Sequence, residues 1–147
     1  AVPDENREML DWEEVRRLDA HGVRIGAHTC NHVLLSRVDA DTAREEIFAS
    51  HDRIAREVGA PPRHFAYPNG GKGDFGTRDI ELARSAGFKT AATSIEGVNR
   101  PDTDHFQLLR YNVHEDRFRS PSGELSEALF FSETSGLLGW LRAWRAQ

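Results

Sequence analysis

Two histidines spaced four residues apart, His28 and His32, are the strongest chemical signal in the sequence. Imidazole nitrogens bind Zn²⁺ and similar ions, and side chains at positions i and i+4 share one face if the segment is helical. The pair follows a predicted strand, and α/β folds build their sites in the loops after the carboxyl ends of strands. Two interpretations stay open at this point: a pair of metal ligands, or a surface pair that binds nothing. Cys30, between them, is expected to be a small buried side chain.

A second segment with chemical potential follows the next predicted strand, where Tyr67 and Pro68 lead into Asn69 and Gly70. Proline cannot continue a central strand, so the chain turns there. A backbone N–H at the exit of a strand is suited to stabilise an oxyanion, and the Tyr67 amide is the candidate. Taken alone, the same residues favour an ordinary strand end and turn.

Helix caps and hydrophobic periodicity predict the elements that must position these segments. Asp11 followed by Glu14 is a capping-box pattern, Asp39 can cap a long helix and Thr77 a short one. Alternating helices and strands indicate an α/β fold with mostly parallel strands, too few to close an eight-stranded barrel. The predicted helices cover 11–20, 39–58 and 78–86, the predicted strands 23–27, 64–67, 88–93 and 108–113, with a loop over 94–107 and helices after 120 that break near 135–136.

Composition excludes several classes of protein. The net charge of −5 over 147 residues, with no basic tract, argues against a nucleic-acid partner. No apolar run is long enough for a membrane span, and the polar, acidic start carries no signal-peptide pattern, so the compartment stays open. A single cysteine excludes an internal disulfide. Position 1 is not Met and the strand count is low, so we expect a later part of a longer domain.

The two chemical segments together resemble one known family. His28-Thr29-Cys30-Asn31-His32 resembles the H-[ST]-x-x-H motif of the polysaccharide deacetylases with a NodB-homology domain, carbohydrate esterase family 4. The segment 65–70, Phe-Ala-Tyr-Pro-Asn-Gly, resembles their [RF]-x-Y-P-x-G motif, in the same order along the chain. The resemblance covers 9–113 of a single partial domain over 1–147, and the remaining 120–147 is expected to be a helical tail.

This resemblance implies part of a distorted (β/α) barrel whose N-terminal strands are missing, and a metal-dependent hydrolase. Such an enzyme removes N-acetyl groups from N-acetylhexosamine units of a polysaccharide, in the cell envelope or outside the cell. His28 and His32 would bind a divalent metal, with Zn²⁺ the expected ion. The Tyr67 amide would stabilise the oxyanion, and Pro68 and Asn69 would contact the substrate.

The sequence also departs from the family pattern. The family's catalytic base and third metal ligand come from an Asp-Asp pair, and no Asp-Asp dipeptide occurs in the chain. The family's general acid lies in a Leu-x-His motif, for which Asn112-Val113-His114 is an incomplete match. Arg110 resembles a family strand residue that orients a carboxylate, although an exposed strand arginine fits equally. We therefore expect the chain alone to be inactive.

Two alternatives to an enzyme stay open. The first is a catalytically inactive carbohydrate- or metal-binding domain, and the second is a structural α/β domain whose histidine pair has no role. Aromatic residues of the tail allow sugar stacking, core packing or an oligomer contact through the C-terminal helix. These residues are Phe130, Phe131, Trp140 and Trp144.

Overall fold

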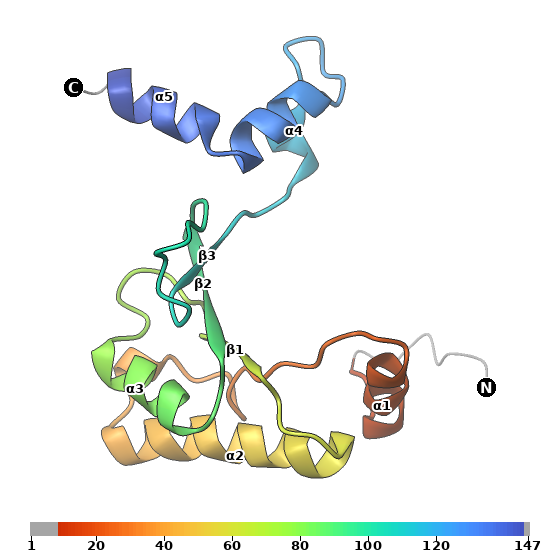
Figure 1. Cartoon of the computed structure of the whole chain (residues 1–147), viewed down its shortest axis with the longest axis vertical. Coiled ribbons are helices and arrows are strands. Elements are labelled where there is room, and N and C mark those ends of the chain that lie inside the picture. The colour runs from red at the N-terminus through yellow and green to blue at the C-terminus, as the bar shows by residue number, and fades with distance from the viewer. Residues whose placement is uncertain (1–8, 146–147) are drawn as a thin grey trace.

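A computed structural model describes residues 9–145, which form a small parallel sheet with helices packed beside it and a helical tail (Figure 1). The α/β class and the helical tail are as predicted. The elements are α1 (Trp12–Ala20), the 3₁₀ turn η1 (Leu35–Arg37), α2 (Ala40–Val58), β1 (His64–Ala66), α3 (Thr77–Ser85), β2 (Thr90–Glu96), β3 (Leu108–Arg110), the 3₁₀ turn η2 (Glu115–Phe118), α4 (Glu127–Thr134) and α5 (Leu137–Arg145).

The sheet has the strand order β1-β2-β3, and both pairs are parallel. Phe65 is in register with Ala91, and Ala92 with Leu108. The chain crosses from β1 to β2 through α3, which is the connection that parallel strands require. Parallel strands end at the same edge, so the segments that follow β1, β2 and β3 start from one side of the sheet.

The hydrophobic core lies between the sheet and the helices α2 and α3. The two helices pack on each other (Figure 1). Their inward faces supply alanine and isoleucine side chains, while β1 and the residues that flank the strands supply aromatic ones. The fully or nearly fully buried members are Ala27, Leu35, Ala43, Ile47, Phe65, Tyr67, Ala83, Phe88, Ala91 and Phe106.

Local sequence signals set the helix ends. Asp11 and Glu14 form the predicted capping box, and Asp39 accepts a hydrogen bond from the Thr42 amide at 2.8 Å at the start of α2. Thr77 does not cap α3 as predicted, because it is the first helical residue. The N-cap position is occupied by a glycine, so the first turn of α3 is stabilised instead by a carboxylate from inside the helix.

The predicted strand over 23–27 is wrong, because the structure has no strand there, and the predicted strand over 108–113 is shorter than expected. Within 23–27, only Ala27 forms a β-bridge, and its partner is Phe65. The strand that begins at Leu108 ends at Arg110. Ala27 donates to the His64 carbonyl, and its own carbonyl accepts from the Ala66 amide, both at 2.9 Å. No other described segment pairs with 23–27, so the ladder does not extend. In contrast, β2 runs past its predicted end at 93.

The helical tail lies away from α2 and α3, beyond β3 (Figure 1). Helix α4 packs on α5 and on η2, and the predicted break falls between them, where Gly136 has φ of 81°. Trp140 and Trp144 are 61% and 65% exposed, and Phe131 is 64% exposed. These side chains are therefore not core residues among the residues described.

None of the described helices combines the length and the hydropathy that crossing a bilayer requires.

Candidate functional site

The histidine loop, residues 28–32, begins at the carboxyl end of β1 and brings its two imidazole rings together. The ring centroids of His28 and His32 are 4.8 Å apart, with an angle of 72° between the ring planes. The loop is irregular and not helical. The proximity therefore arises from the turn of the loop and not from the helical i, i+4 geometry considered for this spacing.

A hydrogen bond fixes the orientation of the His28 ring. Its Nδ1 lies 2.8 Å from the carbonyl oxygen of Ala66, the last residue of β1. A carbonyl only accepts, so Nδ1 must carry the proton, which leaves the Nε2 lone pair for a ligand. Histidines that bind metals are held in this way, with the second ring nitrogen donating to a carbonyl or a carboxylate.

The separation of the rings suits a shared ion. Zn–N distances of about 2.0–2.1 Å place each ring centroid roughly 3.2 Å from the ion, so two rings in a tetrahedral site have centroids about 5 Å apart. The observed 4.8 Å agrees with this geometry. Within residues 9–145, however, no group of three or more His, Cys, Asp or Glu side chains is placed to hold a metal. The pair is therefore two candidate ligands, and a complete site would need further groups.

The backbone of the histidine loop is strained. Thr29 and His32 have φ of 62° and 55°, in the left-handed region. That region is disfavoured for a β-branched residue such as threonine, and a strained position of this kind costs on the order of 1–3 kcal/mol. Such strain persists only where surrounding contacts determine the conformation.

Glu46 on α2 supplies contacts of this kind, although it was not a predicted site residue. Its Oε2 accepts from the amides of Cys30 and Asn31, both at 2.9 Å, and its Oε1 accepts from the Asn31 side chain at 2.6 Å. Burial raises the pKa of Glu46, but these hydrogen bonds outweigh it and the pKa lies below its ordinary value. The sequence does contain one signal that could have identified Glu46: it is an acidic residue at a position that shares the buried face of α2 with Ala43 and Ile47.

Cys30 is exposed, so the prediction that it is buried was wrong. Its backbone amide, in contrast, is bound to Glu46. Partial desolvation, and then the charge of Glu46, raise the pKa of the thiol. A thiol with a raised pKa stays protonated at neutral pH, and the thiolate is the metal-binding form.

Tyr67 is a core residue whose amide is engaged in the sheet. The side chain is fully buried, its O–H donates to the Phe106 carbonyl at 2.9 Å, and its ring stacks on Phe75 with centroids 4.0 Å apart. Its backbone N–H donates to the Ala92 carbonyl at 3.1 Å. An amide that is already bonded within the ladder does not fit the predicted oxyanion role, so this assignment is corrected.

Pro68 and Asn69, which follow Tyr67, differ in burial. Pro68 is fully buried, so the prediction that it contacts substrate was wrong. Asn69 is exposed and left-handed, with φ of 55°. Among the described residues, the Asn69 amide has no hydrogen-bond partner. Asn69 therefore presents the first unoccupied N–H after β1.

Arg110 and His114 follow the third strand. The Arg110 Nε donates to the carbonyl of Thr93, which ties the side chain to β2 at the carboxyl end of the sheet. His114 is exposed, and its Nδ1 lies 3.3 Å from a carboxylate oxygen of Asp116. In residues 9–145, no hydrogen bond or ring contact joins His114 to His28. The assignments of Arg110 and His114 stay predictions.

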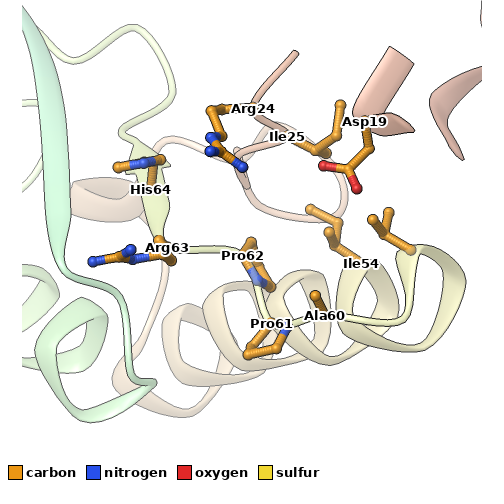
Figure 2. A pocket seen from close by; sticks show the side chains of 10 residues that line it. Asp19, Arg24, Ile25, Ile54, Ala60, Pro61, Pro62, Arg63 and His64 are labelled. Atoms are coloured by element: carbon orange, nitrogen blue, oxygen red, sulfur yellow. The ribbon is translucent and has the colours of Figure 1, made fainter. Parts of the chain in front are cut away.

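A cavity of about 250 Å³ lies at the other end of β1. Figure 2 shows Arg24 and Ile54 on its walls, together with His64, the first residue of β1. The histidine loop instead contacts the last residue of that strand. Sites in α/β folds form at the carboxyl ends of strands, so this cavity is separate from the candidate site. Its lining consists of Asp19, Arg24, Ile25, Ile54, Val58, Ala60, Pro61, Pro62, Arg63 and His64.

Comparison with solved structures identifies the fold. The Streptococcus pyogenes deacetylase PplD, in complex with acetate, superposes with a TM-score of 0.74 at 18% identity, over 88% of this chain and 53% of that chain. IcaB from Ammonifex degensii gives a TM-score of 0.65 at 26% identity, over 74% and 49%. The polysaccharide deacetylase BC0361 from Bacillus cereus gives 0.66 at 18% identity, over 88% and 38%.

The chain thus spans about half the length of these structures or less, and its sheet and helices correspond to part of their (β/α) barrel. No curated protein matched the sequence. The sequence profile of the polysaccharide deacetylases matches residues 3–91, more than half of the chain and including both the histidine loop and the Tyr-Pro segment. The chain belongs to the polysaccharide deacetylase family.

Proposed function

We propose that the chain carries part of the active site of a metal-dependent deacetylase that acts on N-acetylhexosamine units of a polysaccharide. In this hydrolysis, water adds to the amide carbonyl carbon, the carbon–nitrogen bond breaks, and acetate and a free amine leave. The observation that carries the proposal is the pair of rings, His28 and His32, 4.8 Å apart at the carboxyl end of β1 with the first ring locked by Ala66.

His28 and His32 would hold the metal, with Zn²⁺ the expected ion because imidazole nitrogen is one of its preferred ligands. A divalent ion bound there would supply Lewis-acid polarisation of the substrate carbonyl and would lower the pKa of a bound water. The protein contributes orientation: the Ala66 carbonyl selects the His28 tautomer, so that Nε2 is the nitrogen available to the ion.

The Asn69 amide is the oxyanion donor in this proposal. It follows the buried Pro68 and lies in a left-handed turn that leaves its N–H without a partner among the described residues. A fixed backbone N–H stabilises the negative charge that develops on the carbonyl oxygen during attack, and removing such a donor typically costs about 10²–10³ in kcat.

A base and a third metal ligand would come from groups other than the described residues. The chain contains no Asp-Asp dipeptide, and residues 9–145 place no carboxylate with the two histidines as a metal-holding group. We therefore expect the isolated 147-residue chain to release no acetate from an N-acetylglucosamine oligomer. Robust acetate release by this chain would contradict the expectation.

Titration with Zn²⁺ tests the ligand assignment directly. The wild type should bind Zn²⁺ weakly, and a His28→Ala, His32→Ala double variant should lose this binding. His105→Ala is a matched control, since His105 is exposed and distant from the loop in the sequence. Equal affinity in wild type and double variant would exclude the site.

A catalytically inactive carbohydrate- or metal-binding domain is the second candidate. The lack of a third ligand among residues 9–145 favours it, because two histidines bind an ion without supplying a base. Binding of N-acetylglucosamine oligomers, measured by calorimetry on the chain, separates the candidates when combined with the acetate assay.

The proposal has two further parts. The substrate lies in the cell envelope or outside the cell, and the chain self-associates through α5.

A further inference from the structure

We infer that Glu46 is a positioning residue that sets the shape of the histidine loop and thereby the affinity of the histidine pair for its metal. The inference rests on the proposed function. Glu46 lies on α2, far from His28 and His32 in the sequence, and contacts neither ring. It binds Cys30 and Asn31, two of the three residues between the histidines.

The contact is unusually complete for a single carboxylate. The Cys30 and Asn31 amides both donate to Oε2 at 2.9 Å, and the Asn31 side chain donates to Oε1 at 2.6 Å. Two consecutive backbone amides bound to one oxygen determine the orientation of their peptide planes. Since these planes lie between His28 and His32, the carboxylate controls the turn that brings the rings together.

The burial of Glu46 indicates that its carboxylate depends on the hydrogen bonds from the histidine loop. The residue is only 7% exposed and stands in the buried stripe of α2 beside Ala43 and Ile47. A buried carboxylate is costly unless hydrogen bonds compensate the lost hydration. Here the three donors of the loop provide that compensation, so α2 and the loop stabilise each other.

The backbone conformation of the loop requires a stabilising contact, and the Glu46 carboxylate provides one. Thr29 and His32, on either side of the bound amides, are both left-handed. Without Glu46, the loop could relax toward ordinary φ values and move the rings apart. Groups that orient metal ligands from the second layer typically change metal affinity about 10–100-fold when removed.

The test compares three variants of the full chain by Zn²⁺ titration. Glu46→Ala removes the acceptors and should weaken binding about 10–100-fold. Glu46→Gln should retain most of the affinity, because its oxygen can accept from both amides while the Asn31 amide rotates to accept from the new NH₂ group. Asn31→Ala removes one of three bonds and should give an intermediate loss.

Glu45→Ala is the matched control, since Glu45 is the exposed neighbour on the same helix and its loss removes the same charge. It should leave Zn²⁺ affinity unchanged. A second readout needs no metal: the Cys30 and Asn31 amides should exchange hydrogen at least about tenfold faster in Glu46→Ala, with thermal unfolding confirming that the variant is folded.

The outcomes separate the inference from the proposed function. Wild-type affinity that does not depend on His28 and His32 overturns the proposed function. Affinity that depends on both histidines but is unchanged in a folded Glu46→Ala overturns the role of Glu46 alone. If Glu46→Ala does not fold, the decision falls to Asn31→Ala, and unchanged affinity and exchange in that variant overturn the inference.

Discussion

Two segments that meet at the carboxyl end of β1, the histidine loop and residues 67–70, use their residues in opposite ways. The histidine loop exposes both imidazole rings, while its backbone is bound by Glu46. The segment from Tyr67 to Gly70 buries the Tyr67 and Pro68 side chains and leaves one backbone amide, that of the exposed Asn69, without a partner among the described residues. The first segment therefore offers side-chain chemistry on a fixed backbone, and the second offers backbone chemistry on a fixed core.

From this comparison we expect the largest loss of stability when Tyr67 is substituted. Tyr67→Ala should lower the free energy of unfolding by about 3–5 kcal/mol, because it removes a fully buried aromatic ring that stacks on Phe75. Urea unfolding measures the loss. Tyr67→Phe is the control, which loses only the hydrogen bond to Phe106 and should cost about 0.5–1.5 kcal/mol. An equal cost for both variants would contradict a core role for the ring.

Gly70→Ala should have the next largest effect. Gly70 has φ of 70°, and an added Cβ would lie 3.0 Å from the Ser94 amide nitrogen and from the Tyr67 carbonyl oxygen. Both the left-handed backbone and the close approach are unfavourable, so we expect a loss of about 1–3 kcal/mol. Gly73→Ala, also left-handed but in open space, isolates the backbone contribution. A larger loss for the Gly73 variant would contradict the steric part.

Acidification should affect the histidine loop through Glu46. The folded pKa of Glu46 is below its ordinary value of 4.5, so its stabilisation is fully present above that value and is lost as the pH falls through the folded pKa. The difference in unfolding free energy between wild type and Glu46→Gln should therefore shrink below about pH 4.5. A difference that stays constant from pH 7 to pH 3 would argue against a bonded carboxylate.

Substitution of an exposed ring in the histidine loop should have the smallest effect on stability. His32→Asn, which keeps a residue that tolerates a left-handed conformation, should change the unfolding free energy by no more than about 0.5 kcal/mol in the absence of metal. The same variant should weaken Zn²⁺ binding. Loss of stability as large as that of Tyr67→Ala would remove the contrast between the two segments.

Sequence alone could predict the parts of the fold that depend on local contacts. The caps at Asp11 and Asp39 and the break near 135–136 follow from neighbouring residues. The extent of strands could not be predicted as well, because Ala27 and Arg110 pair only as far as another strand runs beside them. Pairing is a property of the sheet and not of the segment.

The candidate site shows the same division. The identities of His28 and His32 were readable from their spacing, but the shape of their loop was not, because it depends on a carboxylate from α2. The engagement of the Tyr67 amide depends on the register between β1 and β2, which no local pattern contains. Local sequence patterns could therefore place these residues at one edge of the sheet, but they could not show which of their atoms are accessible.

The hydrogen bond from His28 to the Ala66 carbonyl distinguishes the two rings, and we expect it to make the His28 ring the less mobile of the two. Among residues 9–145, the His32 ring has no hydrogen bond and contacts the His28 ring edge-on. We therefore expect the His28 side chain to lose rotational entropy when the protein folds. The His32 side chain should lose most of its rotational entropy only when it binds a metal ion. In the metal-free chain, the side chain of His28 should have the higher NMR order parameter, and His32 should carry most of the ordering that accompanies ligation.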